Sequence, residues 1–457
     1  MTQTNPLGYE PLPQLLKKFA VPSIIAMLVS SLYNIVDQIF IGQGVGYLGN
    51  AATNVSYPLT TICMAIALLI GIGSASRFSL YLGAGEKEQA AGVVGNAFLM
   101  MLVGGVVYTI LVELFLHPLL TAFGATPDVM PYAESYTRIT ALGMTLLIGT
   151  NGMSNLARAD GSPKYSMVCM LLGAVINTIL DPIFIFGFGW GVAGAAWATV
   201  IGQFFSFLAA VRYLGHFQHV ELRREMFRLH PAECVKIASL GMSSSLNQLA
   251  ITLVQIVLNN SLTYYGAASE YGTDIPLAAS GIVMKTNAIL LAVIIGISQG
   301  SQPIVGFNYG ARQYARVRKI YKLAVSCCVA VGSVGFVLFE FFPTQIISVF
   351  GTGDALYFEF AVKFMRIFLM MIFVNGVQMI SSNFFSAIGK PVKGMILSLT
   401  RQVLFLIPLL LILPLKWGID GILFSGPVAD FAAFLTTVAL VRHEMRHIRA
   451  LEAVQQA

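Results

Sequence analysis

IGIGSASRFSLYLGAG, from Ile70 to Gly85, returns 225 residues later in a similar form as IGISQGSQPIVGFNYG, from Ile295 to Gly310. Two further pairs of short motifs keep the same order and nearly the same offset. They are GSP at 161–163 with GKP at 389–391, and WGVAG at 190–194 with WGIDG at 417–421. Ordered matches at a nearly constant offset indicate an internal duplication. The sequence therefore predicts two halves with the same fold.

The composition places both halves in a membrane. Of the 457 residues, 56% are hydrophobic and only 11% are charged, and the mean hydropathy is +0.77. Typical soluble domains have about 25% charged residues. A soluble enzyme, a nucleic-acid-binding domain or a disordered regulator could not keep this much apolar surface in water. The net charge of +6 therefore does not indicate nucleic acid as a partner.

Apolar stretches of about 20 residues are long enough to cross the hydrocarbon core of a bilayer as helices. Twelve such stretches follow one another, at approximately 17–41, 52–82, 91–113, 131–157, 165–187, 192–214, 236–264, 276–307, 318–341, 358–386, 394–414 and 419–441. An even number of spans in each half gives both halves the same orientation. We therefore expect an all-α integral membrane protein with twelve transmembrane helices in two parallel six-helix repeats and a cleft between them.

The basic residues indicate how the chain is oriented. Placing Lys17 and Lys18 on the cytoplasmic side, and alternating from there, leaves only Arg138, Lys363, Arg366 and Lys416 on the outer side. Lys285 and Arg401 fall within spans. Because cytoplasmic loops carry an excess of Lys and Arg, we expect a multi-pass protein of the plasma (inner) membrane with both termini in the cytoplasm.

A basic segment joins the two halves at the middle of the chain. The cluster that gives the segment its basic character is Arg212, His216, His219, Arg223, Arg224, Arg228 and Lys236. We expect residues 1–214 to form an N-terminal six-helix lobe, 215–235 a cytoplasmic linker and 236–457 a C-terminal six-helix lobe. A solvated basic loop is the simplest explanation of the charge of the linker.

The cysteines and histidines show no pattern of a metal or redox site. The 5 cysteines lie mostly in apolar runs without C-x-x-C spacing, and the 6 histidines lie in or beside charged connections. We interpret the cysteines as small core residues rather than as disulfide partners or ligands. We expect no cofactor.

Acidic residues within the spans are the informative ones, because an ionisable group in hydrocarbon is costly. Asp37 lies about 27–30 Å along the first span and Asp181 about 24 Å along the fifth, at 1.5 Å per residue, so the two carboxylates can share one site. Each has a polar neighbour one helical turn earlier, Tyr33 and Asn177, and Thr199 reaches a similar depth. The alternative is that Asp181 only caps a helix end before Pro182 and that Asp37 is a hydrogen-bonded structural residue.

These residues, with the stretches around them, resemble the multidrug and toxic compound extrusion (MATE) family of prokaryotic type. The stretches are NTILDP at 177–182, LARADGSP at 156–163, VAGAAWAT at 192–199, QP at 302–303, NYG at 308–310 and RQVLFLIP at 401–408. The resemblance implies a cation-coupled efflux transporter whose ion site is formed by Asp37, Asn177, Asp181 and Thr199.

The resemblance departs from the family pattern in the fourth span. Some relatives place a Glu where this chain has Ser154, between Asn151 and Asn155. We keep both asparagines as candidate residues for substrate or for support of the ion site.

The second half carries its own charges in the spans. Lys285 and Asp430 lie about 12–14 Å and 15–17 Å in from the outer ends of their helices, so we expect them to form an ion pair. Arg401 lies only about 10 Å from the inner end of its span and could snorkel to the interface. Any of the three could instead face substrate.

The function that we expect is antiport of H⁺ or Na⁺ against amphipathic, often cationic, organic compounds such as drugs or toxic metabolites, by alternating access in a monomer surrounded by lipid. Na⁺ bound by Asp37 and Asp181 would be the only metal. A flippase for lipid-linked precursors remains an alternative, but it needs a strongly cationic cavity, and only Lys285 and Arg401 are available. A membrane enzyme is a weaker alternative, because no His, Cys or Ser-Lys grouping supplies a catalytic site.

Overall fold

The computed structural model describes residues 5–349 and 354–456, and the regular structure in these residues is helical throughout. The first half contains α1 (Pro6–Tyr9), α2 (Leu12–Val45), α3 (Tyr47–Ala84), α4 (Lys87–Leu114), α5 (Leu116–Ala122), α6 (Met130–Ala159), α7 (Pro163–Pro182), the π-helical segment η2 (Ile183–Gly187) and α8 (Gly191–Arg212). The second half contains α9 (Pro231–Ala267), α10 (Asp274–Gly310), α11 (Tyr314–Phe341), α12 (Pro343–Val349), α13 (Ala355–Phe368), α14 (Ile372–Ala387), α15 (Pro391–Leu399), the π-helical segment η5 (Thr400–Leu406), α16 (Ile407–Trp417) and α17 (Ile419–Gln456).

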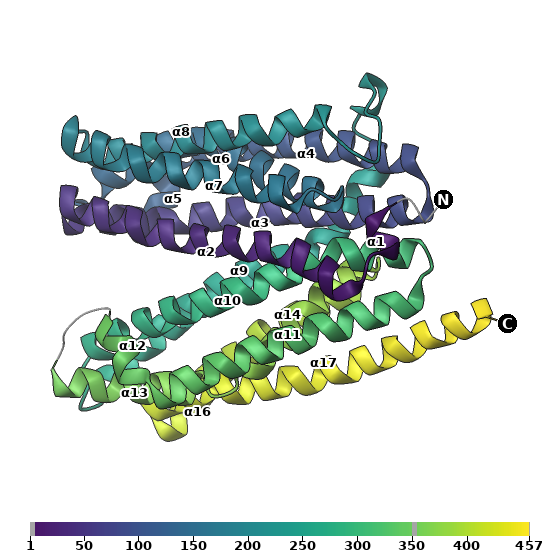
Figure 1. The fold of residues 1–457 in the computed structure, drawn as a ribbon. Helices are drawn as coiled ribbons and strands as arrows, with labels where there is room; N and C mark the ends of the chain where they lie inside the picture. The colour runs from purple at the N-terminus through teal and green to yellow at the C-terminus, as the bar shows by residue number, and fades with distance from the viewer. Residues whose placement is uncertain (1–4, 350–353, 457) are drawn as a thin grey trace.

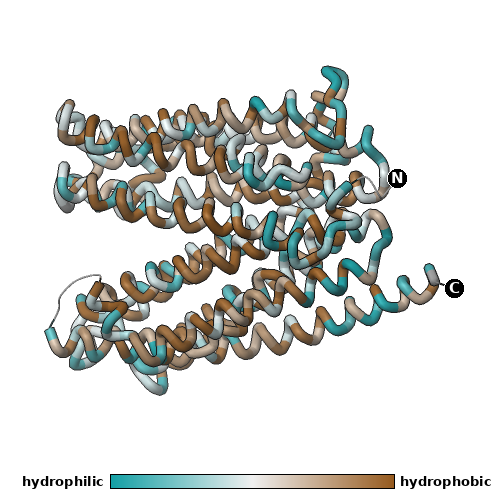
Figure 2. The backbone as a smooth tube through the Cα atoms, in the orientation of Figure 1, coloured by the Kyte–Doolittle hydropathy of each residue, from teal (hydrophilic) through white to brown (hydrophobic). Residues whose placement is uncertain are grey.

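The helices form two bundles that lie side by side. Helices α2 to α8 make up the first bundle and α9 to α17 the second (Figure 1). Both chain ends lie at the same end of the molecule, which we call the termini end. Hydrophobic residues run along the middle of both bundles, and hydrophilic residues gather toward the two ends (Figure 2). This banding is the pattern expected of helices that cross a bilayer.

The predicted spans all fall on helices. Among the described residues, 10 helices are long and apolar enough to cross a membrane, or 11 if α13 and α14, which meet at 50°, count as one span. Helix α6 covers the remaining predicted span and is more polar, with Glu134 and Arg138 in its first half. The chain is therefore a multi-pass membrane protein.

The internal repeat is visible in the order and length of the helices. Helices α4 and α11 both have 28 residues, and each is followed by a helix of 7 residues, α5 and α12. The fifth span of each half contains a π-helical segment, η2 at the end of the span in the first half and η5 within the span in the second. The two matching stretches of sequence end α3 and α10. The prediction of two parallel six-helix repeats is confirmed.

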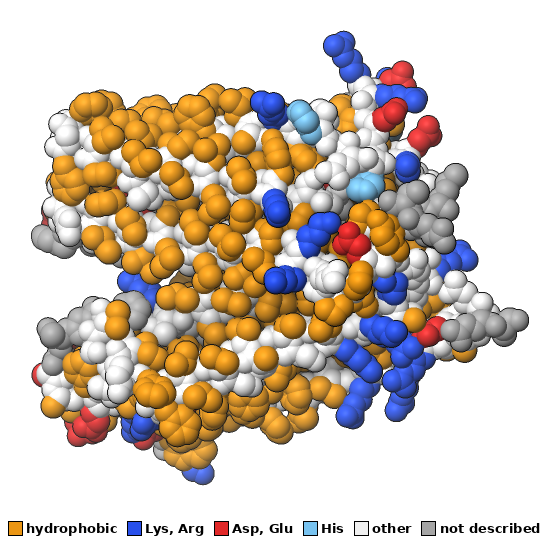
Figure 3. Space-filling model, viewed as in Figure 1, with side chains coloured by type: hydrophobic (Ala, Val, Ile, Leu, Met, Phe, Trp, Pro, Cys, Tyr) orange, Lys and Arg blue, Asp and Glu red, His pale blue; other side chains and the backbone are white. Residues whose placement is uncertain are grey.

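The bundles pack backbone to backbone at the termini end. A Cβ atom added at Gly241 of α9 would lie 1.8 Å from the carbonyl oxygen of Leu69 in α3, and one added at Gly296 of α10 would lie 2.6 Å from Cα of Ile24 in α2. Only small residues allow two helices to approach this closely in a membrane. Toward the opposite end the bundles separate, and a wedge-shaped groove opens between them (Figure 3).

The basic linker is not a free loop. The buried carboxylate of Asp160, at the end of α6, accepts hydrogen bonds from the backbone nitrogens of Gln218 at 2.6 Å and His219 at 3.2 Å, and from the Tyr213 hydroxyl at 2.8 Å. The nitrogen of His230 donates to Oδ1 of Asn96 in α4 at 2.8 Å. The expectation of a solvated loop is correct only for its exposed charges, which include Arg223, Arg224 and Arg228. Its backbone is docked on the first bundle.

Candidate functional site

The candidate site lies inside the first bundle, where α2, α7 and α8 meet. Helix α7 ends at Pro182, and Asp181, the residue before it, is 0% exposed. With its amide nitrogen directed to this carboxylate, Asn177 donates to Oδ2 of Asp181 at 3.1 Å, and its Oδ1 accepts from the hydroxyl of Thr199 on α8 at 3.1 Å. The local hydrogen bonds determine this orientation of the amide. Three of the four residues predicted for an ion site are therefore joined in one chain of hydrogen bonds.

Asp37, the fourth residue, comes from α2. Its carboxyl group lies near enough to that of Asp181 for the two groups to interact electrostatically. Its Oδ1 atom is buried and accepts no hydrogen bond from any described residue. The structure therefore brings Asp37 and Asp181 together, and their shared role as an ion site stays a prediction.

Two tyrosines face the carboxyl pair. Tyr33, one turn before Asp37 on α2, and Tyr136, on α6, both lie near enough to interact electrostatically with the two carboxyl groups. Sequence reasoning anticipated Tyr33 but missed Tyr136. No local signal in the sequence distinguishes Tyr136, because α6 is brought to the site by its packing against other helices, α7 and α8 among them.

The charges around the carboxyl groups of Asp37 and Asp181 determine whether the pair can bind a proton or a cation. Neither Asp37 nor Asp181 forms an ion pair with a described Lys, Arg or His residue. Two adjacent carboxylates without a basic partner cannot both remain charged in a poorly solvated site, unless a cation lies between them. The arrangement is therefore suited to taking up a proton or a small metal cation and releasing it again.

The structure does not bring the two asparagines of α6 into this site. Nδ2 of Asn151 donates to the carbonyl oxygen of Leu147 at 3.0 Å, and Nδ2 of Asn155 donates to that of Asn151 at 2.8 Å. Oδ1 of Asn155 accepts from Arg158 at 3.2 Å. Among the described residues, Asn151 and Asn155 thus form these hydrogen bonds only with other residues of α6, and none with Asp37 or Asp181.

The expected ion pair between Lys285 and Asp430 is wrong. Asp430, which is 4% exposed on α17, pairs instead with Nε of Arg401 on η5. The depth estimate for Arg401 assumed a regular α-helix over 394–414, but residues 400–406 are π-helical, which changes the direction of the side chains on that span. Arg401 therefore points into the bundle and does not snorkel to the interface. Lys285 forms no ion pair with the described residues.

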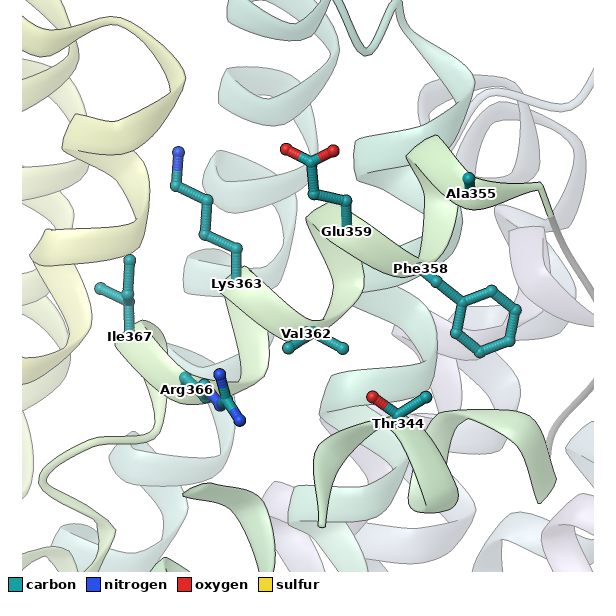
Figure 4. A pocket seen from close by; sticks show the side chains of 8 residues that line it. All are labelled: Thr344, Ala355, Phe358, Glu359, Val362, Lys363, Arg366 and Ile367. Atoms are coloured by element: carbon teal, nitrogen blue, oxygen red, sulfur yellow. The ribbon is translucent and has the colours of Figure 1, made fainter. Parts of the chain in front are cut away.

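A shallow pocket of about 500 Å³ lies on α12 and α13, away from the candidate site. Glu359 and Lys363 project from the same side of α13 (Figure 4). Lys363 is paired with Asp420 of α17 at 2.6 Å, and Glu359 accepts a 3.3 Å hydrogen bond from the Tyr271 hydroxyl. These contacts connect helices of the second bundle at the opposite end, and none of them involves Asp37 or Asp181.

Two parallel helical bundles, a groove between them and a buried pair of carboxyl groups are together the features of a membrane transporter. Comparison with known proteins gives the family. The chain belongs to the MatE family, whose model matches residues 22–183 and 243–412.

Relatives of similar length share about a quarter of the sequence. The multidrug export protein MepA of Staphylococcus saprophyticus is 25% identical over 93% of this chain and 92% of its own length. The FAD transporter of Shewanella oneidensis is 25% identical over 97% of each chain. A protein described as a multidrug export protein and one described as a transporter of FAD are thus equally similar to this chain.

Solved structures show the same fold. A transporter of the MOP superfamily from Pyrococcus furiosus superposes with a TM-score of 0.90 at 22% identity, over 97% of this chain and 98% of that chain. An outward-facing multidrug resistance transporter of the MATE family superposes with a TM-score of 0.90 at 23% identity, over 98% of each chain.

Proposed function

We propose that this protein is a secondary active exporter that couples the inward movement of H⁺ or Na⁺ to the expulsion of amphipathic organic compounds. The observation that supports the proposal most strongly is the carboxyl pair of Asp37 and Asp181, with its unbonded oxygen and without a basic partner. Asn177 and Thr199 support the pair through the hydrogen bonds from Asn177 to Asp181 and from Thr199 to Asn177. The protein works as a monomer and needs no cofactor.

The coupling follows from the two roles of α2. This helix carries Asp37 into the ion site, and it contacts α10 of the second bundle through Ala20 and Ile24. An ion can shift a conformational equilibrium only if it binds the two states with different affinity. Neutralising the carboxyl pair stabilises one position of α2 in the first bundle, and the contact with α10 transmits that preference to the packing of the bundles.

The direction of transport follows from the charge distribution. Most Lys and Arg side chains visible on the face in Figure 3 lie toward the termini end. An excess of basic residues favours the cytoplasm, so the termini end is cytoplasmic and the groove opens outward. The protein resides in the plasma membrane, takes up its substrate from the cytoplasm and releases it through the groove. The names of the relatives, a multidrug export protein and a transporter of FAD, support small organic molecules as substrates.

The test is transport by the purified protein in liposomes, with a pH gradient and a Na⁺ gradient imposed separately. A panel of organic dyes of both charge signs serves as substrate. We expect one of the two gradients to drive dye movement and an ionophore for that ion to abolish it. Equal dye movement in the absence of both gradients would exclude a secondary active exporter.

A further inference from the structure

Lys285 lies on the face of α10 that is directed toward the first bundle. At the termini end, Gly296 and Gly300 mark this face. A Cβ atom added at Gly296 would lie 2.6 Å from Cα of Ile24 in α2, and one added at Gly300 would lie 2.6 Å from Cα of Ala20 in the same helix. Lys285 precedes Gly296 by 11 residues, which is close to three helical turns and about 16 Å along the axis. The two residues therefore share one face. Because α2 and α10 diverge toward the opposite end, that face forms a wall of the groove (Figure 1, Figure 3).

The surroundings of Lys285 leave this wall open. Ala278, Lys285 and Ala288 are all exposed, and a Cβ atom added at Gly281 would meet nothing within 4 Å. The other side of the helix, with Val283 at 0% exposed, is packed inside the second bundle. Ala278, Gly281 and Ala288 thus lie beside the lysine, together with the half-buried Ile282 and Ile289, and an apolar molecule can lie against this face of the helix beside the ammonium group.

The charge of Lys285 is not compensated by the protein. Asp430 is held by Arg401, and Asp420 is held by Lys363. The described residues form ten ion pairs, and none of them includes Lys285. No described carboxylate therefore lies within 4.0 Å of the Lys285 nitrogen. An unpaired lysine within a span is costly against lipid, but it is tolerated in a cavity that contains water. Such a residue marks a substrate pathway.

Helix α9 adds hydrogen-bonding groups to the same bundle. Gly241 is the point at which α9 contacts α3, and Gln248, Thr252, Gln255 and Asn259 follow it at helical spacing on the same face. Nε2 of Gln255 donates to Oδ1 of Asn259 at 3.0 Å, which leaves the Asn259 amide nitrogen as a donor. Helices α9 and α10 pack against each other, so the second bundle presents amide groups and an ammonium group toward the groove.

We propose that the substrates of this exporter carry an acidic group, a carboxylate, sulfonate or phosphate, which binds Lys285 while the apolar part of the molecule lies on the small residues around it. The substrate class is thus the amphipathic organic anion or zwitterion rather than the lipophilic cation. This inference rests on the proposed function, which it deepens by giving the sign of the substrate charge. A phospholipid headgroup has the same chemistry, and the experiment separates the two sources.

The experiment measures equilibrium binding to the purified full-length protein in neutral detergent, by fluorescence polarisation, so that it does not depend on ion coupling. Fluorescein is the anionic probe and rhodamine 6G is the cationic one. We expect the wild type to bind fluorescein at least ten times more tightly than rhodamine 6G. Lys285→Met should weaken fluorescein binding at least tenfold, whereas Lys285→Arg should remain within about threefold of the wild type. The matched control is Lys416→Met, which removes an exposed charge in the last turn of α16 and should leave binding unchanged.

Three results would overturn the proposal. The first is tighter binding of rhodamine 6G by the wild type, and the second is unchanged fluorescein binding by Lys285→Met. The third is retention of phosphatidylglycerol, observed by native mass spectrometry, that depends on Lys285 while fluorescein does not bind at all. In that case the groove lysine holds lipid. Failure of the proposed function has a different signature, since fluorescein would bind through Lys285 but no ion gradient would drive its transport.

Discussion

Nη1 of Arg158, on α6 of the first bundle, donates a 3.0 Å hydrogen bond to Oε1 of Gln299, on α10 of the second bundle. Arg158 is only 3% exposed, so this bond connects the two bundles from within. Nearby, Nε of Arg77 on α3 pairs with Oε1 of Glu233 on α9 at 2.9 Å. These contacts hold the termini end closed while the groove is open at the other end.

Breaking the half-buried pair between Arg77 and Glu233 should favour opening of the termini end. Glu233→Gln removes the charge and keeps the shape, and we expect a loss of about 1 kcal/mol, which is a shift of about fivefold in the population of the two states. Spin labels at the exposed residues Lys164 and Lys319, on α7 and α11, measure the separation of the bundles. An unchanged distance distribution would show that this ion pair does not hold the termini end closed.

The close approach of α3 and α9 should be sensitive to a single methyl group. Gly241→Ala places a Cβ atom 1.8 Å from the Leu69 carbonyl oxygen, so the helices must separate, and we expect an increase in the population with longer distances between the same spin labels. The matched control is Gly92→Ala in α4, where the added atom meets nothing within 4 Å. Because alanine favours a helix by about 1 kcal/mol over glycine, the control should be neutral or slightly stabilising. Identical behaviour of the two variants would exclude tight packing at Gly241.

The pair of Arg401 and Asp430 should contribute to the stability of the second bundle. Asp430→Asn leaves the Arg401 guanidinium, whose side chain is 13% exposed, without its counter-charge. Loss of one partner of a buried pair costs about 3–5 kcal/mol. Thermal unfolding in detergent should therefore show a clear drop in Tm for Asp430→Asn. The double variant with Arg401→Leu and Asp430→Leu should recover most of that drop, and a double variant less stable than Asp430→Asn would contradict this account of the pair.

The sequence predicted the repeat from motifs that recur in the same order and the spans from the length of the apolar stretches, and regular helix geometry indicated that Asp37 and Asp181 could lie close together. It did not predict the partner of Asp430, since the π-helical segment at 400–406 has no distinctive composition. The break between α13 and α14 was missed for a similar reason, as Leu369, Met370 and Met371 include no proline or glycine. The docking of the linker depends on Asp160 and Asn96 from helices distant in sequence, which no local pattern indicates.

The central claim is that Asp37 and Asp181 bind the coupling ion, and it is tested most directly by gradient-driven dye transport in liposomes. Asp37→Asn and Asp181→Asn keep the size and hydrogen bonding of the side chains but cannot exchange a proton or neutralise a cation. We predict that each variant loses gradient-driven transport by at least about tenfold, equivalent to about 1.4 kcal/mol, while its dye binding and Tm stay near those of the wild type. The matched control is Asp420→Asn, which changes a partly buried acidic residue of α17 that is paired with Lys363, and this variant should transport normally. Transport at the wild-type rate by both Asn variants, at equal amounts of reconstituted protein, would contradict the account.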